Sequence, residues 1–143
     1  MVYMGKDENN HFNFLGLTFY WGRQGSRRVF KVKTMKEKLH RAIEEFDVWV
    51  KTSRSKFKLR VLWEKAKSKI RGHVNYFGYQ GNQLKLCHFI NRAQRSLFKW
   101  LNRRSQKKSY YWKNFKERLK HFPLIDDLKN LKLKQLGWNP YAL

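Results

Sequence analysis

The chain has 143 residues and carries 33 Lys and Arg against ten Asp and Glu, a formal net charge of +23. A polycation of this density repels itself unless it binds a polyanion, which favours nucleic acid as partner and an anionic membrane surface as second candidate. The sequence has no apolar run near the ~18 residues of a membrane span, and its first ten residues lack the apolar core of a signal peptide. We therefore expect no membrane partner. The lone Cys87 excludes a disulfide within the chain, which suits a reducing compartment, so we expect a cytoplasmic location.

The positive charge is concentrated in the middle of the chain. Residues 51–122 hold 21 Lys and Arg but only two acidic residues, Glu64 and Glu117. The same segment holds 13 of the 24 aromatic residues. Disordered basic tails contain few aromatic residues, so this composition predicts a folded domain with an aromatic core and a basic surface.

The N-terminal part is rich in strand-forming residues. Residues 1–11 are polar, and residues 13–22 and 27–34 read as two strands joined by a short glycine-containing turn. The first strand is apolar on both faces, and an isolated hairpin is marginal in water. We therefore expect residues 1–34 to form a tail and a β-hairpin that is the edge of a larger sheet.

Four helices are predicted after the hairpin. They cover residues 35–51 and 56–77, then a third that ends near residue 104, and a fourth between Ser109 and Pro123. Apolar residues at helix spacing are expected to face inward: Leu39, Ile43, Phe46, Val50, Leu59, Leu62, Ala66, Ile70, Val74, Phe77, Leu86, Ile90, Ala93, Leu97, Trp100 or Leu101, Trp112, Phe115, Leu119 and Phe122. The predicted fold is mainly α, with a basic three- to four-helix bundle over residues 35–124 and a tail over residues 125–143.

Several residues are predicted to shape the ends of these helices. Thr34 and Glu37 have the spacing of a capping box at the start of the first helix. Gly72 is expected to allow close helix packing, and Gly78 to end the second helix in a left-handed conformation. Gly81 and the residue after it complete a short turn.

No catalytic constellation is recognisable. Glu44 and Asp47 lie one turn apart but are expected to be solvated, and the five His residues show no i, i+4 pair that would suit zinc. Cys87 and His88 are neighbours on a helix and point about 100° apart, which does not suit a nucleophile and its base. There is no glycine-rich phosphate loop. We predict no catalysis, no metal and no cofactor.

The first group of candidate RNA-binding residues lies in the segment 70–82. Arg71 is the best candidate for a phosphate contact, and Asn75 and Tyr76 can bond to or stack on unpaired bases. His73 belongs to the same group, although a packed or surface histidine is the favoured interpretation. The alternative is that the segment is only a helix end, and the two interpretations are compatible.

The second group lies on the third helix and just after it. Arg92, Arg95 and Lys99 fall at i, i+3 and i+7, and no acidic residue between Lys65 and Lys116 explains them by i, i+4 pairing. The run that follows suits a phosphate clamp, the alternative being a solvated loop. Its candidate residues are Arg103, Arg104, Gln106, Lys107 and Lys108.

Three segments resemble bacterial group II intron reverse transcriptase/maturases. They are FLGLTFYWG (residues 14–22), IRGHVNYFGYQGN (70–82) and FKWLNRRSQKKSYYWKNFKERLKHFPL (98–124). The family has similar motifs in the same order, and the resemblance covers roughly residues 12–124. It implies that the hairpin is the end of a polymerase palm and that the helices are the thumb, or maturase-specific domain X, of this mobile element. That domain binds the intron RNA, assists its splicing and holds the template-primer duplex.

The resemblance is incomplete. The family's Tyr-Ala-Asp-Asp palm and its fingers lie upstream of the matched region and are absent, and the tail IDDLKNLKLKQLGWNPYAL does not match. We therefore expect an intron-RNA-binding module without a polymerase site. The alternatives are a truncated relic, a subunit that assembles with a separately encoded palm and contacts an RNA/DNA duplex, and a basic DNA-binding protein of another family.

Overall fold

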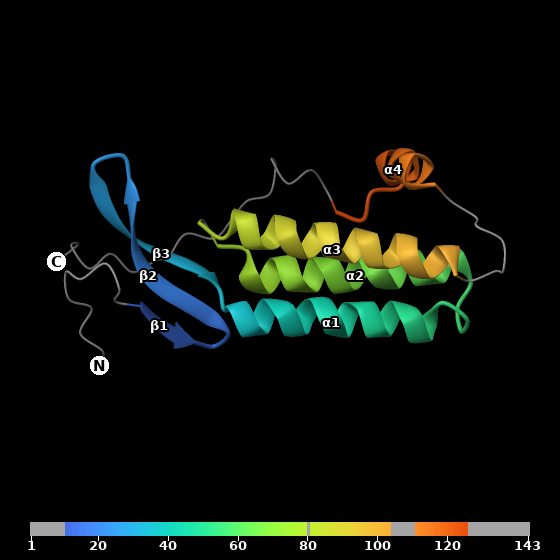
Figure 1. Ribbon diagram of the computed structural model, residues 1–143, viewed down its shortest axis with the longest axis horizontal. Helices are drawn as coiled ribbons and strands as arrows, with labels where there is room; N and C mark the ends of the chain where they lie inside the picture. The colour runs from blue at the N-terminus through green and yellow to red at the C-terminus, as the bar shows by residue number, and fades with distance from the viewer. Residues whose placement is uncertain (1–10, 80, 104–110, 126–143) are drawn as a thin grey trace.

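The computed structural model describes residues 11–79, 81–103 and 111–125, and it confirms the predicted fold class. An antiparallel sheet at the N-terminal end is followed by helices (Figure 1). The elements are β1 (His11–Phe14), β2 (Leu17–Gln24), β3 (Arg27–Thr34), α1 (Lys36–Ser53), α2 (Leu59–Phe77), α3 (Gln83–Asn102) and α4 (Trp112–His121).

The sheet has one strand more than the predicted hairpin. β2 and β3 form that hairpin, with Gln24 opposite Arg27. The prediction of one continuous strand over residues 13–22 is wrong. Leu15 and Gly16 have positive φ angles of 54° and 81°, and the chain reverses direction there. β1 therefore pairs with β2 in the order β1-β2-β3. Asn and Gly are the usual residues of such a turn, so a leucine there gives no turn signal.

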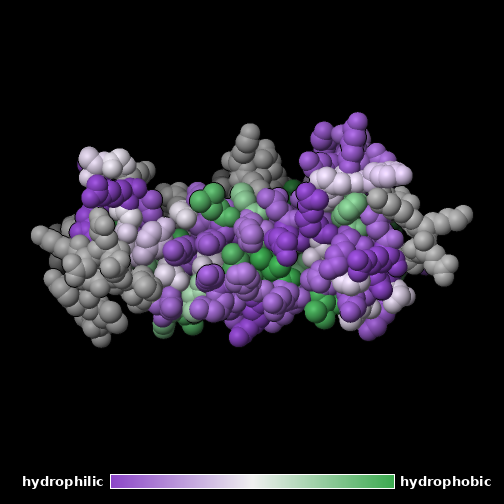
Figure 2. Space-filling model, in the orientation of Figure 1, coloured by the Kyte–Doolittle hydropathy of each residue, from purple (hydrophilic) through white to green (hydrophobic). Residues whose placement is uncertain are grey.

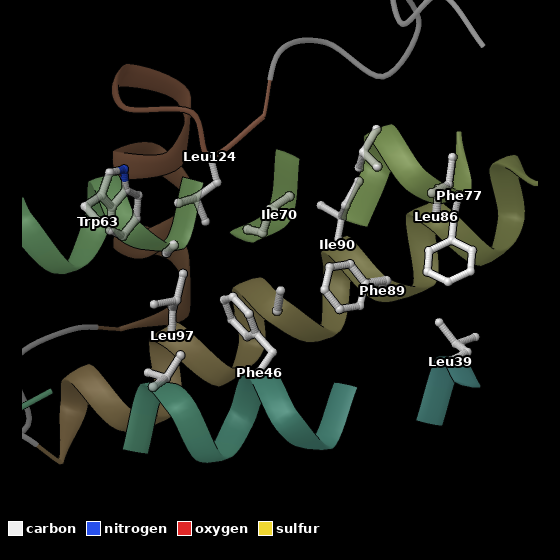
Figure 3. Close-up of a cluster of buried hydrophobic side chains, with 14 of the residues drawn as sticks. Leu39, Phe46, Trp63, Ile70, Phe77, Leu86, Phe89, Ile90, Leu97 and Leu124 are labelled. Atoms are coloured by element: carbon white, nitrogen blue, oxygen red, sulfur yellow. The ribbon is translucent and has the colours of Figure 1, made fainter. Parts of the chain in front are cut away.

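The first three helices form an up-down-up bundle. α1, α2 and α3 lie side by side, the sheet lies at one end, and α4 crosses near the opposite end (Figure 1). Their apolar stripes converge in one core, in which Phe46 of α1, Ile70 of α2 and Ile90 of α3 are buried (Figure 3). Leu17 and Val32 bring the sheet into the same core.

The predicted inward side chains lie in this core or pack against it, with one exception. Phe122 is 60% exposed. α4 ends at His121, and the backbone at Phe122 leaves the helical conformation, with φ −128° and ψ 74°. The ring therefore does not continue the inward stripe, while its carbonyl oxygen accepts a hydrogen bond from Trp63 Nε1 at 3.2 Å.

The predicted helix ends need three corrections. The predicted capping box is wrong, because the N-cap of α1 is Met35, which makes no side-chain cap, and Thr34 is the last residue of β3. The Thr34 hydroxyl accepts a hydrogen bond from Asn82 Nδ2 at 2.8 Å. Gly78 has φ −78° and is not left-handed, whereas Gly81 has φ 94°. Gly72 is exposed and a Cβ there would meet nothing within 4 Å, so close packing does not require this glycine.

Candidate nucleic-acid interface

Hydrophilic residues cover most of the face of the bundle seen in Figure 2, interrupted by a few apolar patches. The basic residues predicted on α3 are exposed: Arg92, Arg95, Lys99 and Arg103, which directly follows the helix. The i, i+3 and i+7 spacing of Arg92, Arg95 and Lys99 predicts a single basic face. In the structure, Arg95 faces α4, whereas Lys99 and Arg92 lie near Asp47 of α1.

Arg95 lies on the α4 side. Its guanidinium carbon is 3.7 Å from the centroid of the Trp112 ring, a cation–π distance. Trp112 also meets Phe98 of α3 edge-on, with ring centroids 5.1 Å apart. Arg95 therefore helps to join α4 to α3, whatever else it binds.

Asp47 of α1 lies near Lys99 and Arg92 of α3. Its Oδ1 accepts hydrogen bonds from Ser96 Oγ at 2.8 Å and from Trp100 Nε1 at 2.9 Å, and Lys99 Nζ is 3.8 Å away. Burial alone would raise the pKa of Asp47, but these hydrogen bonds and the charges of Lys99 and Arg92 together hold the pKa below its ordinary value. The expectation of solvated carboxylates holds for Glu44, which is exposed, but only in part for Asp47, whose side chain is 30% exposed. Its partners come from a helix about fifty residues later in the chain, which spacing within α1 does not reveal.

Four cations surround the ring of Trp100. The distances to its centroid are 5.4 Å for Lys51 Nζ, 4.7 Å for Arg54 Cζ, 4.5 Å for Lys99 Nζ and 5.2 Å for Arg103 Cζ. We call Lys51, Arg54, Lys99, Arg103 and Trp100 the Trp100 cluster. Trp100 is only 7% exposed, because it belongs to the hydrophobic core and the cations lie over its ring.

The Trp100 cluster forms where two helices end. α1 and α3 run in the same direction, and their C-terminal ends meet at the end of the bundle away from the sheet (Figure 1). The negative end of a helix dipole favours cations in the last turn. Lys51 and Arg54 were not among the residues predicted from the sequence to bind RNA. The i, i+3 spacing of Lys51 and Arg54 at the C-terminal end of α1 and the i, i+4 spacing of Lys99 and Arg103 indicate two basic edges, but only helix pairing brings them together.

The candidates in the segment 70–82 separate into exposed and packed residues. Arg71 and Asn75 are exposed on α2. Tyr76 is 50% exposed, and its hydroxyl donates a hydrogen bond to the carbonyl oxygen of Leu15 at 2.9 Å. Its hydroxyl thus holds the β1–β2 turn against the end of α2.

His73 is the packed residue of this segment. Its ring stacks on Phe89, with centroids 3.7 Å apart and planes at 12°, and lies 4.7 Å from the ring of Phe77. Burial lowers the pKa of His73 to about 4. The imidazole is therefore neutral near pH 7 and carries no charge for a phosphate.

The other predicted residues of the basic run, Arg104, Gln106, Lys107 and Lys108, lie outside the described residues. Within the part of the chain that the structure describes, no group of three His, Cys, Asp or Glu side chains could hold a metal ion. None of the helices described has the length and apolar composition that crossing a membrane requires. No protein-family model matches the chain, and no curated protein or solved structure matches it.

Proposed function

We propose that this chain is a maturase-type RNA-binding domain that binds group II intron RNA and assists its splicing, without a polymerase active site. The observation that supports it best is the set of exposed cations along α3 that meets the basic end of α1. Asp47 is the one carboxylate that contacts them among the described residues. Surplus cations of this kind suit the phosphate backbone of a nucleic acid.

The resemblance of three sequence motifs to maturases favours structured RNA over other polyanions. Arg71 contacts a phosphate in this proposal, while Asn75 and the exposed face of Tyr76 contact unpaired bases, which are the usual targets of sequence-specific RNA recognition. Arg92 and the Trp100 cluster contact the backbone. A cytoplasmic location, where Cys87 stays reduced, belongs to the same proposal.

The proposal is tested by measuring affinity for a group II intron RNA and for duplex DNA of equal charge over a series of salt concentrations. We expect at least about tenfold tighter binding to the intron RNA, since charge alone does not distinguish the two. Arg71→Ala should lower the salt slope by about one unit. Arg41→Ala, an exposed arginine on α1, is the matched control. Equal affinity for both nucleic acids would favour a generic basic DNA-binding protein.

A second candidate function is supported by the β1–β2 turn. Phe14 and Leu15 are 60% and 66% exposed, and the turn is held by hydrogen bonds from the Tyr76 hydroxyl and from Met35 N to the Gly16 carbonyl oxygen. A fixed, exposed apolar pair suits contact with another chain, such as a separately encoded palm. Phe14→Ser with Leu15→Asn should abolish co-purification with such a palm and leave RNA affinity unchanged. A truncated, non-functional relic would bind neither the intron RNA nor a palm specifically.

A further inference from the structure

The Trp100 cluster carries more positive charge than its surroundings neutralise. All four cations lie within 5.4 Å of one ring centroid, so no two are much farther apart than the ~10 Å Debye length at 0.1 M salt. Asp47 supplies one negative charge, 3.8 Å from Lys99, and no other ion pair with these cations is formed by the described residues. Their repulsion is therefore only partly offset, by Asp47, the indole face and the helix ends.

Arg54 adds a second observation. Its Nη1 atom is buried and has no hydrogen-bond acceptor among the described residues. A buried donor without an acceptor is unfavourable. An arginine that lacks an acceptor within a group of unneutralised cations suits an anionic oxygen ligand, because the guanidinium presents its donors as a planar fork.

The state of the Trp100 ring shows which part of a nucleic acid would bind. A base that stacks on an aromatic side chain needs an open ring face. Trp100 is 7% exposed, and the cations stand over it. Its indole N–H is already donated to Asp47, so neither the ring nor its polar edge is available. The ring thus positions the cations, and the ligand is a phosphate rather than a base.

We propose that the Trp100 cluster is a phosphodiester-binding site at the junction of α1 and α3, which holds one or two phosphates of the RNA backbone. Lys51 and Arg54 reach the backbone from α1, and Lys99 and Arg103 reach it from α3. Trp100 and Asp47 are positioning residues, because the indole carries the cations and the carboxylate fixes the indole. The inference rests on the proposed RNA-binding function for the identity of its ligand.

The site itself is tested with inorganic pyrophosphate and the full chain labelled with ¹⁵N. The resonance of the Trp100 indole N–H, assigned through Trp100→Phe, should shift and saturate during the titration. Lys51→Ala with Arg54→Ala should abolish that shift. Lys36→Ala with Arg41→Ala removes the same charges from exposed positions on the same helix and should leave the shift intact. Equal shifts in the wild type and both double variants would overturn the proposal.

The ligand is tested with the same variants against intron RNA. The Lys51/Arg54 variant should lower the salt slope of RNA binding by one to two units, and the Lys36/Arg41 variant by less. An equal loss in both would overturn a local site while leaving RNA binding in place. Thermal melting of both variants checks that each is folded. The milder Arg54→Lys keeps the charge, so it should leave the salt slope nearly unchanged but weaken the affinity if the arginine fork binds phosphate.

Two further outcomes separate the site from the proposed function. If the wild type shows the pyrophosphate shift but no preference for intron RNA over duplex DNA, the anion site stands and the maturase function and the RNA ligand fail. If the Lys51/Arg54 variant loses binding to phosphatidylserine vesicles but keeps its RNA salt slope, the ligand is a lipid headgroup and the proposed RNA ligand is overturned.

Discussion

Asn82 binds Thr34 through both atoms of its side-chain amide. Asn82 Oδ1 accepts a hydrogen bond from Thr34 N at 2.9 Å, and Nδ2 donates one to Thr34 Oγ1 at 2.8 Å. The same Nδ2 donates to the carbonyl oxygen of Phe77 at 2.8 Å. One fully buried side chain thus joins the end of β3, the end of α2 and the start of α3.

The first prediction concerns this junction. Asn82→Ala leaves the buried Thr34 N–H without its partner and removes one of the two hydrogen bonds to the Phe77 carbonyl, which keeps the one from Tyr79 N. It should lower the free energy of unfolding by about 3 kcal/mol. Denaturant unfolding measures this. Asn91→Ala, at an exposed position of α3, should change the free energy by less than about 0.5 kcal/mol. A similar small change for both would contradict a structural role for Asn82.

The second prediction is a pH dependence caused by His73. Its pKa is lowered from 6.5 to about 4 in the folded chain. Between these values the unfolded chain binds more protons at this site, so stability should fall as the pH drops from 6.5 to 4, by up to about 3 kcal/mol. Glu45 and Lys69 line the same open cavity, of about 210 Å³, and are the charged groups nearest to consider.

Matched variants isolate this effect. His73→Gln should remove the contribution to the pH dependence even if it lowers stability at every pH. His88→Gln, at an exposed position on α3, should retain the pH dependence of the wild type. Urea unfolding at a series of pH values gives the comparison, and identical curves for the two variants would show that His73 titrates normally.

The third prediction concerns the contribution of Arg95 to the packing of α4 against α3. Because the guanidinium lies 3.7 Å from the Trp112 ring, Arg95→Ala should lower the unfolding free energy by about 1 kcal/mol and speed amide hydrogen exchange in α4. Arg92→Ala, exposed on the same helix, should leave exchange in α4 unchanged. If neither variant affects α4, the ring contact does not hold the helix.

The fourth prediction concerns Gly72. A Cβ at this helical position meets nothing within 4 Å, so Gly72→Ala should stabilise the chain by roughly 0.5 to 1 kcal/mol. Gly81→Ala is the contrasting control, because φ 94° strains any side chain there and should destabilise the fold. A rise in melting temperature for the first and a fall for the second is the expected result. If Gly72→Ala also weakens RNA binding, the glycine allows close approach of the ligand.

Local patterns account for much of what was predictable. Apolar residues at helix spacing located all four helices, since an amphipathic helix buries one stripe wherever its partner lies. The prediction that Phe122 continues this apolar stripe was wrong, because the backbone leaves the helical conformation at that residue. The break at Leu15 and Gly16 was missed because a leucine in a left-handed turn contradicts the preference on which such predictions depend.

The sequence by itself determined the excess of positive charge, the helical periodicity and the apolar residues of the core, because these depend on composition and on spacing within one element. Only the tertiary structure decided the partners of Asp47, the burial of His73 and the meeting of Lys51 and Arg54 with Lys99 and Arg103. Each of these depends on the packing of α1 against α3 or of α2 against α3, between residues far apart in the chain. Spacing within a helix fixes the direction of a side chain, but only helix packing decides what that side chain meets.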